Sequence, residues 1–301
     1  MTEVATYYED VAAAPAPAPA ARRRRRGAGF WVYLGVATSL AVVFVLPIIW
    51  AILRSFQPAR LSSLAPQSAD FTQMTFSNYR AVSHGQYDIL PNLLNSVIVG
   101  LGTALLTTVV ATLAGYGLAK FRFRGSGIVF GIILLALMIP FQAVLTPLYL
   151  ELSDLHLTNN LLGLILVYST FNLPFGVFVM RNTFQQVPQE LVESARVDGA
   201  GFMFTLVRVM RPLIVPGLAT CAMYAFLYAW TELLQAVTFV QSPEKLTLPA
   251  KLYEVTTSTY GSINNAYLSA GVVIAMVPCV ILYFALQRYY VQGMMSGAVK
   301  G

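Results

Sequence analysis

Charged residues are what this sequence lacks most. Only 11% of the 301 residues are charged, whereas 57% are hydrophobic and the mean hydropathy is +0.65. This balance excludes an ordinary water-soluble domain and predicts a membrane protein. The formal net charge of +6 could suggest nucleic-acid binding, but the basic residues flank apolar runs and form no stripe interleaved with aromatics. We therefore expect no nucleic-acid partner.

Residues that commonly carry chemistry are also scarce. Cys221 and Cys279 lie inside apolar runs without CxxC spacing, so we interpret them as small buried hydrophobic residues and not as a metal site or a disulfide. His84 and His156 lack HExxH spacing, and the phosphate-binding pattern GxxxxGK[ST] is absent. The sequence predicts no catalytic residue, no metal site and no cofactor bound by this chain.

Long uncharged runs indicate membrane-spanning helices. A helix needs roughly 20 apolar residues to cross a bilayer, and six runs reach that length. We therefore expect an all-α integral membrane protein with six transmembrane helices and lipid as its surrounding. The runs are residues 30–53, 90–119, 128–150, 161–180, 213–239 and 267–287.

The positions of lysine and arginine predict the orientation. Placing the amino terminus inside puts most of these residues in the cytoplasm, as is usual for proteins of the cell membrane. The prediction is a multi-pass protein with both termini cytoplasmic. The inner set is Arg22–Arg26, Lys120, Arg122, Arg124, Arg181, Arg196, Arg208, Arg211, Arg288 and Lys300, and the outer set is Arg54, Arg60, Arg80, Lys245 and Lys251.

Composition also divides the chain into segments. Residues 1–29 combine alternating Ala and Pro with five arginines, which predicts a disordered cytoplasmic tail. A signal peptide is the competing interpretation, but the apolar run that follows is too long and lacks a small-residue cleavage site. We expect a first transmembrane helix and an outer loop over residues 30–89, a core of five helices over 90–290, and a cytoplasmic tail over 291–301.

A polar stretch, QELVESARVDGAGFMFTLVRVMR (residues 189–211), separates two strongly apolar blocks and still has the features of a helix. Pro188 suits the first helical position, Glu190 suits the positive end of the helix dipole, and Gly199 is a natural stop. Ser194 and Ala195 are small, so another protein could approach the backbone closely. This stretch is predicted to be a docking element and not a linker.

The spacing within this stretch resembles the EAA signature of ABC importer permeases, the cytoplasmic loop that contacts the ATP-binding subunit. The loop covers about residues 188–212. Its matching residues are Glu193, Ser194, Ala195, Asp198, Gly199 and Ala200, followed by Pro212 and Pro216.

Further runs resemble the carbohydrate branch of these permeases, of the maltose importer type. They include NSVIVGLGTALLTTVVATLAGYGLAKFRFRG, MIPFQAVLTPLYLELSDLHLTNNLLGLILVY and LPFGVFVMRNTFQQVPQELVESARVDGA, and with the carboxyl end they cover about two-thirds of the chain. Two residues depart from the pattern. Arg211 stands where Leu is usual before the proline, and Thr231 stands where Asn commonly precedes the acid of the fifth helix.

The resemblance implies a type I ABC importer permease fold and a pore subunit that moves a sugar inward. It implies a second related permease, two ATP-binding subunits that hold ATP and Mg, and an extracytoplasmic sugar-binding protein. The carboxyl tail, with Gly293 and Gly297, resembles a segment that reaches between the ATP-binding subunits. Its glycines would permit an extended, close approach. A frayed terminus is the simpler alternative.

Glu232 is the acidic residue placed within a predicted span, and a carboxylate at membrane depth usually faces a cavity or a partner. Lining of a translocation path and anchoring of a helix end both remain open for it. Tyr224, Tyr228 and Trp230 lie nearby in the sequence. Their rings suit the apolar faces of sugars, although Trp and Tyr also gather at membrane interfaces for other reasons.

Three alternatives compete with a sugar permease. The chain could pass another small solute, or it could be a membrane scaffold without transport. An ion-coupled secondary carrier is the third, but such a carrier is expected to have inverted repeats and several intramembrane charges. A single Glu232 fits that pattern poorly.

Overall fold

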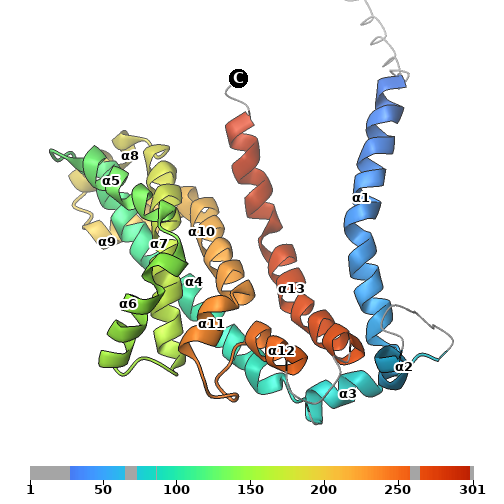
Figure 1. Ribbon diagram of the computed structural model, residues 1–301. Coiled ribbons are helices and arrows are strands. Elements are labelled where there is room, and N and C mark those ends of the chain that lie inside the picture. The colour runs from blue at the N-terminus through green and yellow to red at the C-terminus, as the bar shows by residue number, and fades with distance from the viewer. Residues whose placement is uncertain (1–27, 65–72, 86, 258–264, 299–301) are drawn as a thin grey trace, which may run out of the picture. The chain divides into compact units, whose positions relative to one another are not determined.

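The computed structural model describes residues 28–64, 73–85, 87–257 and 265–298, and the regular elements within these ranges are all helical (Figure 1). The expected disordered tail therefore lies almost wholly outside the described residues. The elements are α1 (Ala28–Ser55), α2 (Ala59–Leu64), α3 (Ser77–His84), α4 (Leu90–Lys120), α5 (Ser126–Leu135), η1 (Ala136–Met138), α6 (Phe141–Asp154), α7 (Leu161–Gln185), α8 (Gln189–Val197), α9 (Phe202–Phe204), η2 (Thr205–Met210), α10 (Arg211–Thr231), α11 (Leu234–Phe239), α12 (Leu248–Thr257) and α13 (Asn265–Ala298).

The chain forms two compact units, Met1–Ile48 and Ile49–Gly301. In the first unit, α1 exposes large apolar side chains around its whole circumference, such as Trp31 and Phe44. A helix that is apolar on every side suits a lipid environment. In the second unit, the elements from α3 onward pack around α4, α7 and α10.

Five helices among the described residues are long and apolar enough to cross a membrane. A sixth crossing exists if one bent pair is counted as a single span. The five are Gly29–Ser55, Leu90–Lys120, Leu161–Gln185, Phe202–Thr231 and Asn265–Ala285, and the bent pair is Ser126–Met138 with Phe141–Asp154.

The bent pair corrects the expectation of one continuous helix over residues 128–150. Its two halves meet at an angle of 98°, and the bend lies at Ile139 and Pro140. Ile139 takes an extended conformation, with φ −81° and ψ 113°, and Pro140 has no N–H to continue the helical hydrogen bonds. Proline therefore divides this predicted span.

The expected span over residues 213–239 is also interrupted. The helix α10 ends at Thr231, Glu232 is extended with φ −71° and ψ 121°, and α11 begins at Leu234. At its other end, the spanning helix begins earlier than predicted, at Phe202. The π-helical segment η2 joins the polar stretch to the apolar one without a break.

Small residues let the three central helices approach closely. At Gly176 of α7, an added Cβ would lie 2.9 Å from the Cβ of Ala111 in α4 and 3.0 Å from the Sγ of Cys221 in α10. Any larger residue would push these helices apart, because buried membrane helices rely on close contact of their backbones. Cys221 is buried and free, as the sequence predicted.

Side-chain amides secure the loop that connects α11 to α12. Asn92 of α4 donates to the carbonyls of Pro243 and Leu246, both at 2.9 Å. Asn159, which precedes α7, donates to the Ser242 hydroxyl at 2.8 Å and accepts from the Ser242 N–H at 3.0 Å. The loop therefore belongs to the packed body although it has little regular structure of its own.

The last helix, α13, continues to Ala298 and contains Gly293 and Gly297. The backbone of these residues is therefore helical and not extended, and their suggested role between the ATP-binding subunits stays a prediction. A helix satisfies its own backbone hydrogen bonds, and each internal glycine costs it only about 1 kcal/mol relative to alanine. Residues 299–301 lie outside the described ranges.

Candidate functional site

The polar stretch that sequence analysis singled out folds into the amphipathic helix α8. Pro188 lies just before its first residue, and Glu190 occupies its first turn, where a negative charge suits the helix dipole. Val192 and Ala195 are buried, whereas Glu193 and Ser194 are exposed. The helix therefore packs one face onto the protein and presents the other to an approaching partner.

The helix ends in the turn that its glycine allows. Gly199 has φ +81°, and the N–H of Ala200 donates to the carbonyl of Ala195 at 2.9 Å. This is the Schellman arrangement, in which a left-handed residue lets the chain bond back to the last turn. A Cβ added to Gly199 would meet nothing within 4 Å, so the glycine faces open space. Its positive φ, and not crowding, is what makes glycine suitable here.

Aromatic packing supports the buried face of α8. Tyr116, at the end of α4, contacts Phe184 of α7 and Phe202 of α9, with ring centroids 5.4 and 5.0 Å apart. Lys120 reaches across from α4, and its Nζ donates to the carbonyl of Val187 at 2.6 Å. These contacts fix the stretch before α8 to the ends of two long helices.

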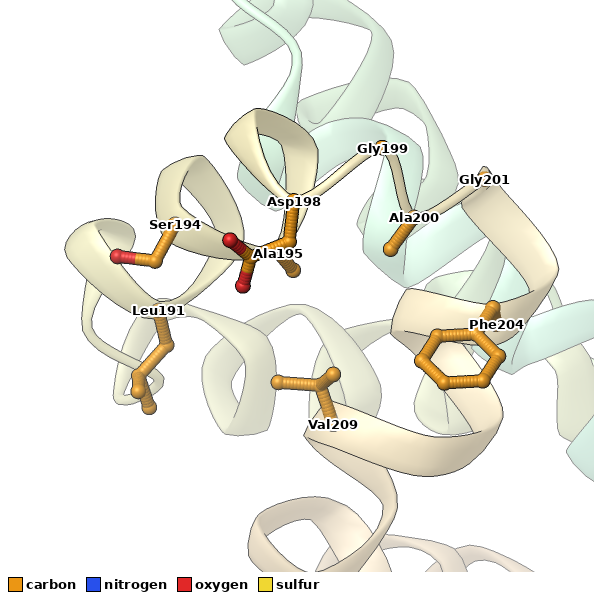
Figure 2. A pocket seen from close by; sticks show the side chains of 9 residues that line it. All are labelled: Leu191, Ser194, Ala195, Asp198, Gly199, Ala200, Gly201, Phe204 and Val209. Atoms are coloured by element: carbon orange, nitrogen blue, oxygen red, sulfur yellow. The ribbon is translucent and has the colours of Figure 1, made fainter.

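A hollow of about 640 Å³ lies between α8 and the segment that follows it (Figure 2). Phe204 and Val209 extend into this space from one side, and the carboxylate of Asp198 lies at its rim. The hollow is mainly apolar with a polar edge, which suits a mixed protein surface better than a small charged metabolite. Its lining residues are Leu191, Ser194, Ala195, Asp198, Gly199, Ala200, Gly201, Phe204 and Val209.

A second hollow, of about 700 Å³, lies on the other side of α8. It is polar, and its charged lining residues are Lys120, Arg122 and Glu193. The sequence-predicted residues are therefore divided between two surfaces. Glu193 lies at the polar hollow, and the other five line the apolar one.

Several lining residues were missed by sequence reasoning. Leu191, Gly201, Phe204 and Val209 join the apolar hollow although none belongs to the recognised spacing. Lys120 joins the polar hollow from a different helix, 67 positions away from its bonded carbonyl. Leu191 lies on α8 itself and could have been found from helical periodicity, whereas Lys120 required the tertiary fold.

The segment η2, which follows the hollow, is a π-helix. Pro212 is the second residue of the helix α10 that follows directly, and it has no N–H to donate to the preceding turn; Pro216 lies farther inside α10. A π-helical segment has wider turns than an α-helix and occurs often at functional sites. The connection between the docking element and α10 is therefore irregular at the point where motion would pass.

The residues suggested for a translocation path are only partly brought together. Tyr224 stacks near Phe175 with centroids 4.0 Å apart, and Tyr228 accepts a hydrogen bond from the Nε2 of Gln235 at 2.6 Å. Glu232 is partly exposed, and its Oε1 accepts from the N–H of Gln235 at 2.9 Å. These three residues follow the side of α10 that faces α7 and α11.

Trp230 lies elsewhere. Its side chain is only 3% exposed, and its Nε1 donates to the carbonyl of Ala275 in α13 at 3.2 Å. Its ring stacks on Phe226 with centroids 5.4 Å apart. The structure thus places Trp230 between α10 and α13, where it packs two helices together, and we no longer include it with the other three residues.

Among the residues that the structure describes, no group of three or more His, Cys, Asp or Glu side chains could hold a metal ion. His84 is exposed, and its Nδ1 contacts the Ser83 hydroxyl at 2.9 Å. His156 is also exposed, in the turn before α7, with φ +55°.

The geometry defines an integral membrane protein whose helical bundle presents an amphipathic helix at one end. Comparison with known proteins agrees with this class. Residues 108–296 match the family described as "Binding-protein-dependent transport system inner membrane component". The chain belongs to this family, which consists of the membrane permease subunits of ABC transporters.

Relatives cover most of the chain. The trehalose transport system permease protein SugB of Mycobacterium tuberculosis is 31% identical over 89% of this chain and 97% of its own length. The arabinooligosaccharides transport system permease protein AraQ of Bacillus subtilis is 31% identical over 87% of this chain and 92% of its own.

A solved structure of a bacterial ABC transporter involved in the import of the polysaccharide alginate contains a chain with the same architecture. The TM-score is 0.75 at 23% identity, with 92% of this chain and all of that chain covered. The chain therefore has the type I ABC importer permease fold, as the sequence predicted.

Proposed function

We propose that this chain is one half of the pore of an ATP-driven importer that moves a sugar into the cytoplasm. The observation that carries the proposal is the amphipathic helix α8, which ends at Gly199 and is bordered by two hollows. An exposed helix with small residues beside an apolar hollow fits a protein partner. The names of the relatives SugB and AraQ support a sugar as the solute.

The partner at α8 is an ATP-binding subunit. Glu193 and Ser194 offer it a charged and a small exposed position on one helix, the buried Ala195 lines the hollow, and Asp198, Gly199 and Ala200 form the turn beside them. This chain has no phosphate-binding pattern, so ATP and Mg are held by that subunit. The permease supplies the path, and its partner supplies the energy.

Motion passes from the docking element to the spanning helices through direct contacts. Val192 belongs to the same buried cluster as Phe184 of α7, Tyr116 of α4 and Ile214 of α10. Packed interfaces move as units because their side chains interlock. When the ATP-binding subunits close, α8 moves with them, and the inner ends of three spanning helices follow.

The other components of the proposed importer are a second, related permease, a second ATP-binding subunit and an extracytoplasmic sugar-binding protein. Both termini of this chain face the cytoplasm in the proposed arrangement. The Arg22–Arg26 cluster, Lys120 and Arg122 then share the side of α8, in accord with the usual excess of basic residues there.

Uptake by right-side-out membrane vesicles tests the proposal. Right-side-out vesicles that hold the whole complex and internal ATP are given the binding protein with radiolabelled trehalose, arabinotriose or diacetylchitobiose. We expect ATP-dependent accumulation of one of them and no effect of collapsing the ion gradients. Uptake that follows an ion gradient without ATP would show a secondary carrier, and absence of any uptake would favour a scaffold or another solute.

A further inference from the structure

Regular helical hydrogen bonding stops between α10 and α11, well inside the apolar part of the sequence. The N–H of Glu232 still donates to the carbonyl of Tyr228 at 3.0 Å, but Glu232 itself is extended. Irregular backbone at membrane depth is tolerated where it is buried in protein or lines a water-filled cavity. Broken helices of this kind often form the solute sites of transporters.

Four polar side chains gather at this break: Tyr168 of α7, and Tyr228, Glu232 and Gln235 around the break itself. The Tyr168 and Tyr228 rings meet edge to face with centroids 6.0 Å apart. The Gln235 side chain donates to the Tyr228 hydroxyl, and the backbone N–H of Gln235 donates to the Glu232 carboxylate.

Two polar atoms of this cluster have no hydrogen-bond partner among the described residues. They are the hydroxyl of Tyr168, whose residue is 0% exposed, and the Oε1 of Gln235, whose residue is 1% exposed. A buried polar group without a partner costs about 1 to 3 kcal/mol. Phenylalanine at position 168 would avoid that cost for the folded chain. A ligand that forms a hydrogen bond with the Tyr168 hydroxyl would explain why this position is tyrosine and not phenylalanine.

We propose that Tyr168, Glu232 and Gln235 form a recognition site for sugar hydroxyl groups at the break between α10 and α11. The inference rests on the proposed function. A sugar hydroxyl both donates and accepts, so it can accept from the Tyr168 O–H and donate to the Gln235 Oε1 or the Glu232 carboxylate. The break opens as the helices move and admits the solute to these groups.

Neighbouring aromatic residues extend the site in one direction. Phe175 lies two helical turns beyond Tyr168 on α7, and Tyr224 lies one turn before Tyr228 on α10. The ring centroids of Phe175 and Tyr224 lie 4.0 Å apart, so α7 and α10 bring these two rings to the same place. An aromatic face suits the apolar face of a sugar ring. Polar atoms at the break and rings beside it together match a polyol with one apolar face.

A metal cation fits this cluster less well. The cluster contains a single carboxylate, and the described residues contain no metal-binding group of His, Cys, Asp and Glu. Calcium sites normally use six to eight oxygen ligands, several of them charged. The Tyr168 hydroxyl is a donor in its ordinary state and would point its proton at the ion. A neutral, hydroxylated solute satisfies both unpaired atoms.

The test is the substitution Tyr168→Phe, which removes the hydroxyl and keeps the ring. Thr170→Val is the matched control, because it removes a hydroxyl from the same helix that already donates to the Leu166 carbonyl at 2.8 Å. Both variants are assembled with the partner subunits in proteoliposomes. The sugar that wild-type vesicles import, out of trehalose, arabinotriose and diacetylchitobiose, is the probe.

We expect Tyr168→Phe to lower the maximal uptake rate roughly tenfold, the effect of about one lost hydrogen bond, and Thr170→Val to leave it within twofold. The half-saturating sugar concentration stays the same, because the binding protein sets it. The melting temperature of the Tyr168→Phe complex stays equal or rises, since an unpaired buried hydroxyl has been removed. A purely structural tyrosine would lose stability and uptake together.

Equal uptake by Tyr168→Phe and wild type, at equal complex yield, would overturn the recognition site and leave the sugar importer intact. A fall in uptake that matches a fall in melting temperature would also overturn it. If the wild-type complex imports none of the three sugars, the proposed function fails first and the site fails with it. Failure of the proposed function is therefore seen in the wild-type complex, whereas failure of the recognition site alone is seen in the Tyr168→Phe complex.

Discussion

Gly199 combines an unusual backbone with an open surface. Its φ of +81° costs residues other than glycine about 1 to 2 kcal/mol, yet a Cβ there would meet no atom within 4 Å. Strain and a new side chain at the docking surface would therefore arise together. A substitution at Gly199 alone therefore does not separate the effect on the backbone from the effect on the docking surface.

We predict that Gly199→Asp abolishes uptake and loses the ATP-binding subunit in detergent pull-down. The aspartate adds backbone strain and a second carboxylate beside Asp198, in the rim of the apolar hollow. Glu193→Ala is expected to be milder, because an exposed charge contributes about 0 to 1 kcal/mol. Insertion and pairing with the second permease remain normal in both, since the loop lies outside the bilayer.

Gly201→Asp is the control for this experiment. Gly201 also lines the hollow and has open space around it, but its φ of −70° suits any residue. If Gly201→Asp behaves like Gly199→Asp, the added carboxylate is responsible and not the turn. Normal uptake and pull-down in Gly199→Asp would remove α8 from the coupling path.

Residues of the docking element could be predicted from the sequence because their signals are local. A helix stop at glycine and a buried pair at Val192 and Ala195 follow from neighbours along the chain. Tyr168 and Gln235 could not be found this way, because they lie far apart in sequence and meet only through Tyr228. The contact of Trp230 with α13 could not be found this way either, because it depends on how α13 packs against α10.

At the scale of elements, η2 connects the docking element to the spanning helix α10 through a π-helical turn, which is wider than an α-helical turn. One residue corresponds to about 100° of rotation on an α-helix, so the π-helical turn sets how α8 faces relative to α10. Pro212 cannot donate to the turn before it, which removes one of the bonds that could hold this segment.

We predict that deletion of Val207 converts η2 to an ordinary α-helix and uncouples transport. Val207 is 48% exposed, so its removal takes little from the core, whereas the wide π-helical turn beside the docking element is lost. Uptake should fall at least tenfold while the purified complex still hydrolyses ATP. Val207→Ala, which keeps the chain length, is the control. A deletion variant with normal uptake would show that the π-helical register is unimportant.

The number and rough place of the spanning segments could be predicted, but not their breaks. Pro147, Pro174 and Pro278 all lie inside continuous helices, whereas Pro140 coincides with a 98° bend. The sequence shows a proline at each position. Which proline breaks a helix depends on what the freed backbone groups can contact, and that is decided by packing.

At the scale of the whole molecule, the chain is a part of a larger machine. We predict that the purified chain alone hydrolyses no ATP, because it has no phosphate-binding loop. The assembled complex, prepared in the same detergent, is the positive control. Turnover by the isolated chain that persists after removal of copurifying ATPases, and that a point variant of this chain changes, would contradict the prediction.

The bend at Pro140 has a consequence for how the cell makes this protein. Met138 is 77% exposed and Ile139 is 50% exposed at a place where the backbone leaves its helix. Apolar side chains that project at a bend suit contact with another helix surface, and we expect a neighbouring subunit to cover them. A chain synthesised without that neighbour would leave the apolar side chains at this bend uncovered. Its abundance should then follow the supply of the neighbour, and balanced synthesis of the two subunits becomes a condition for the lifetime of each.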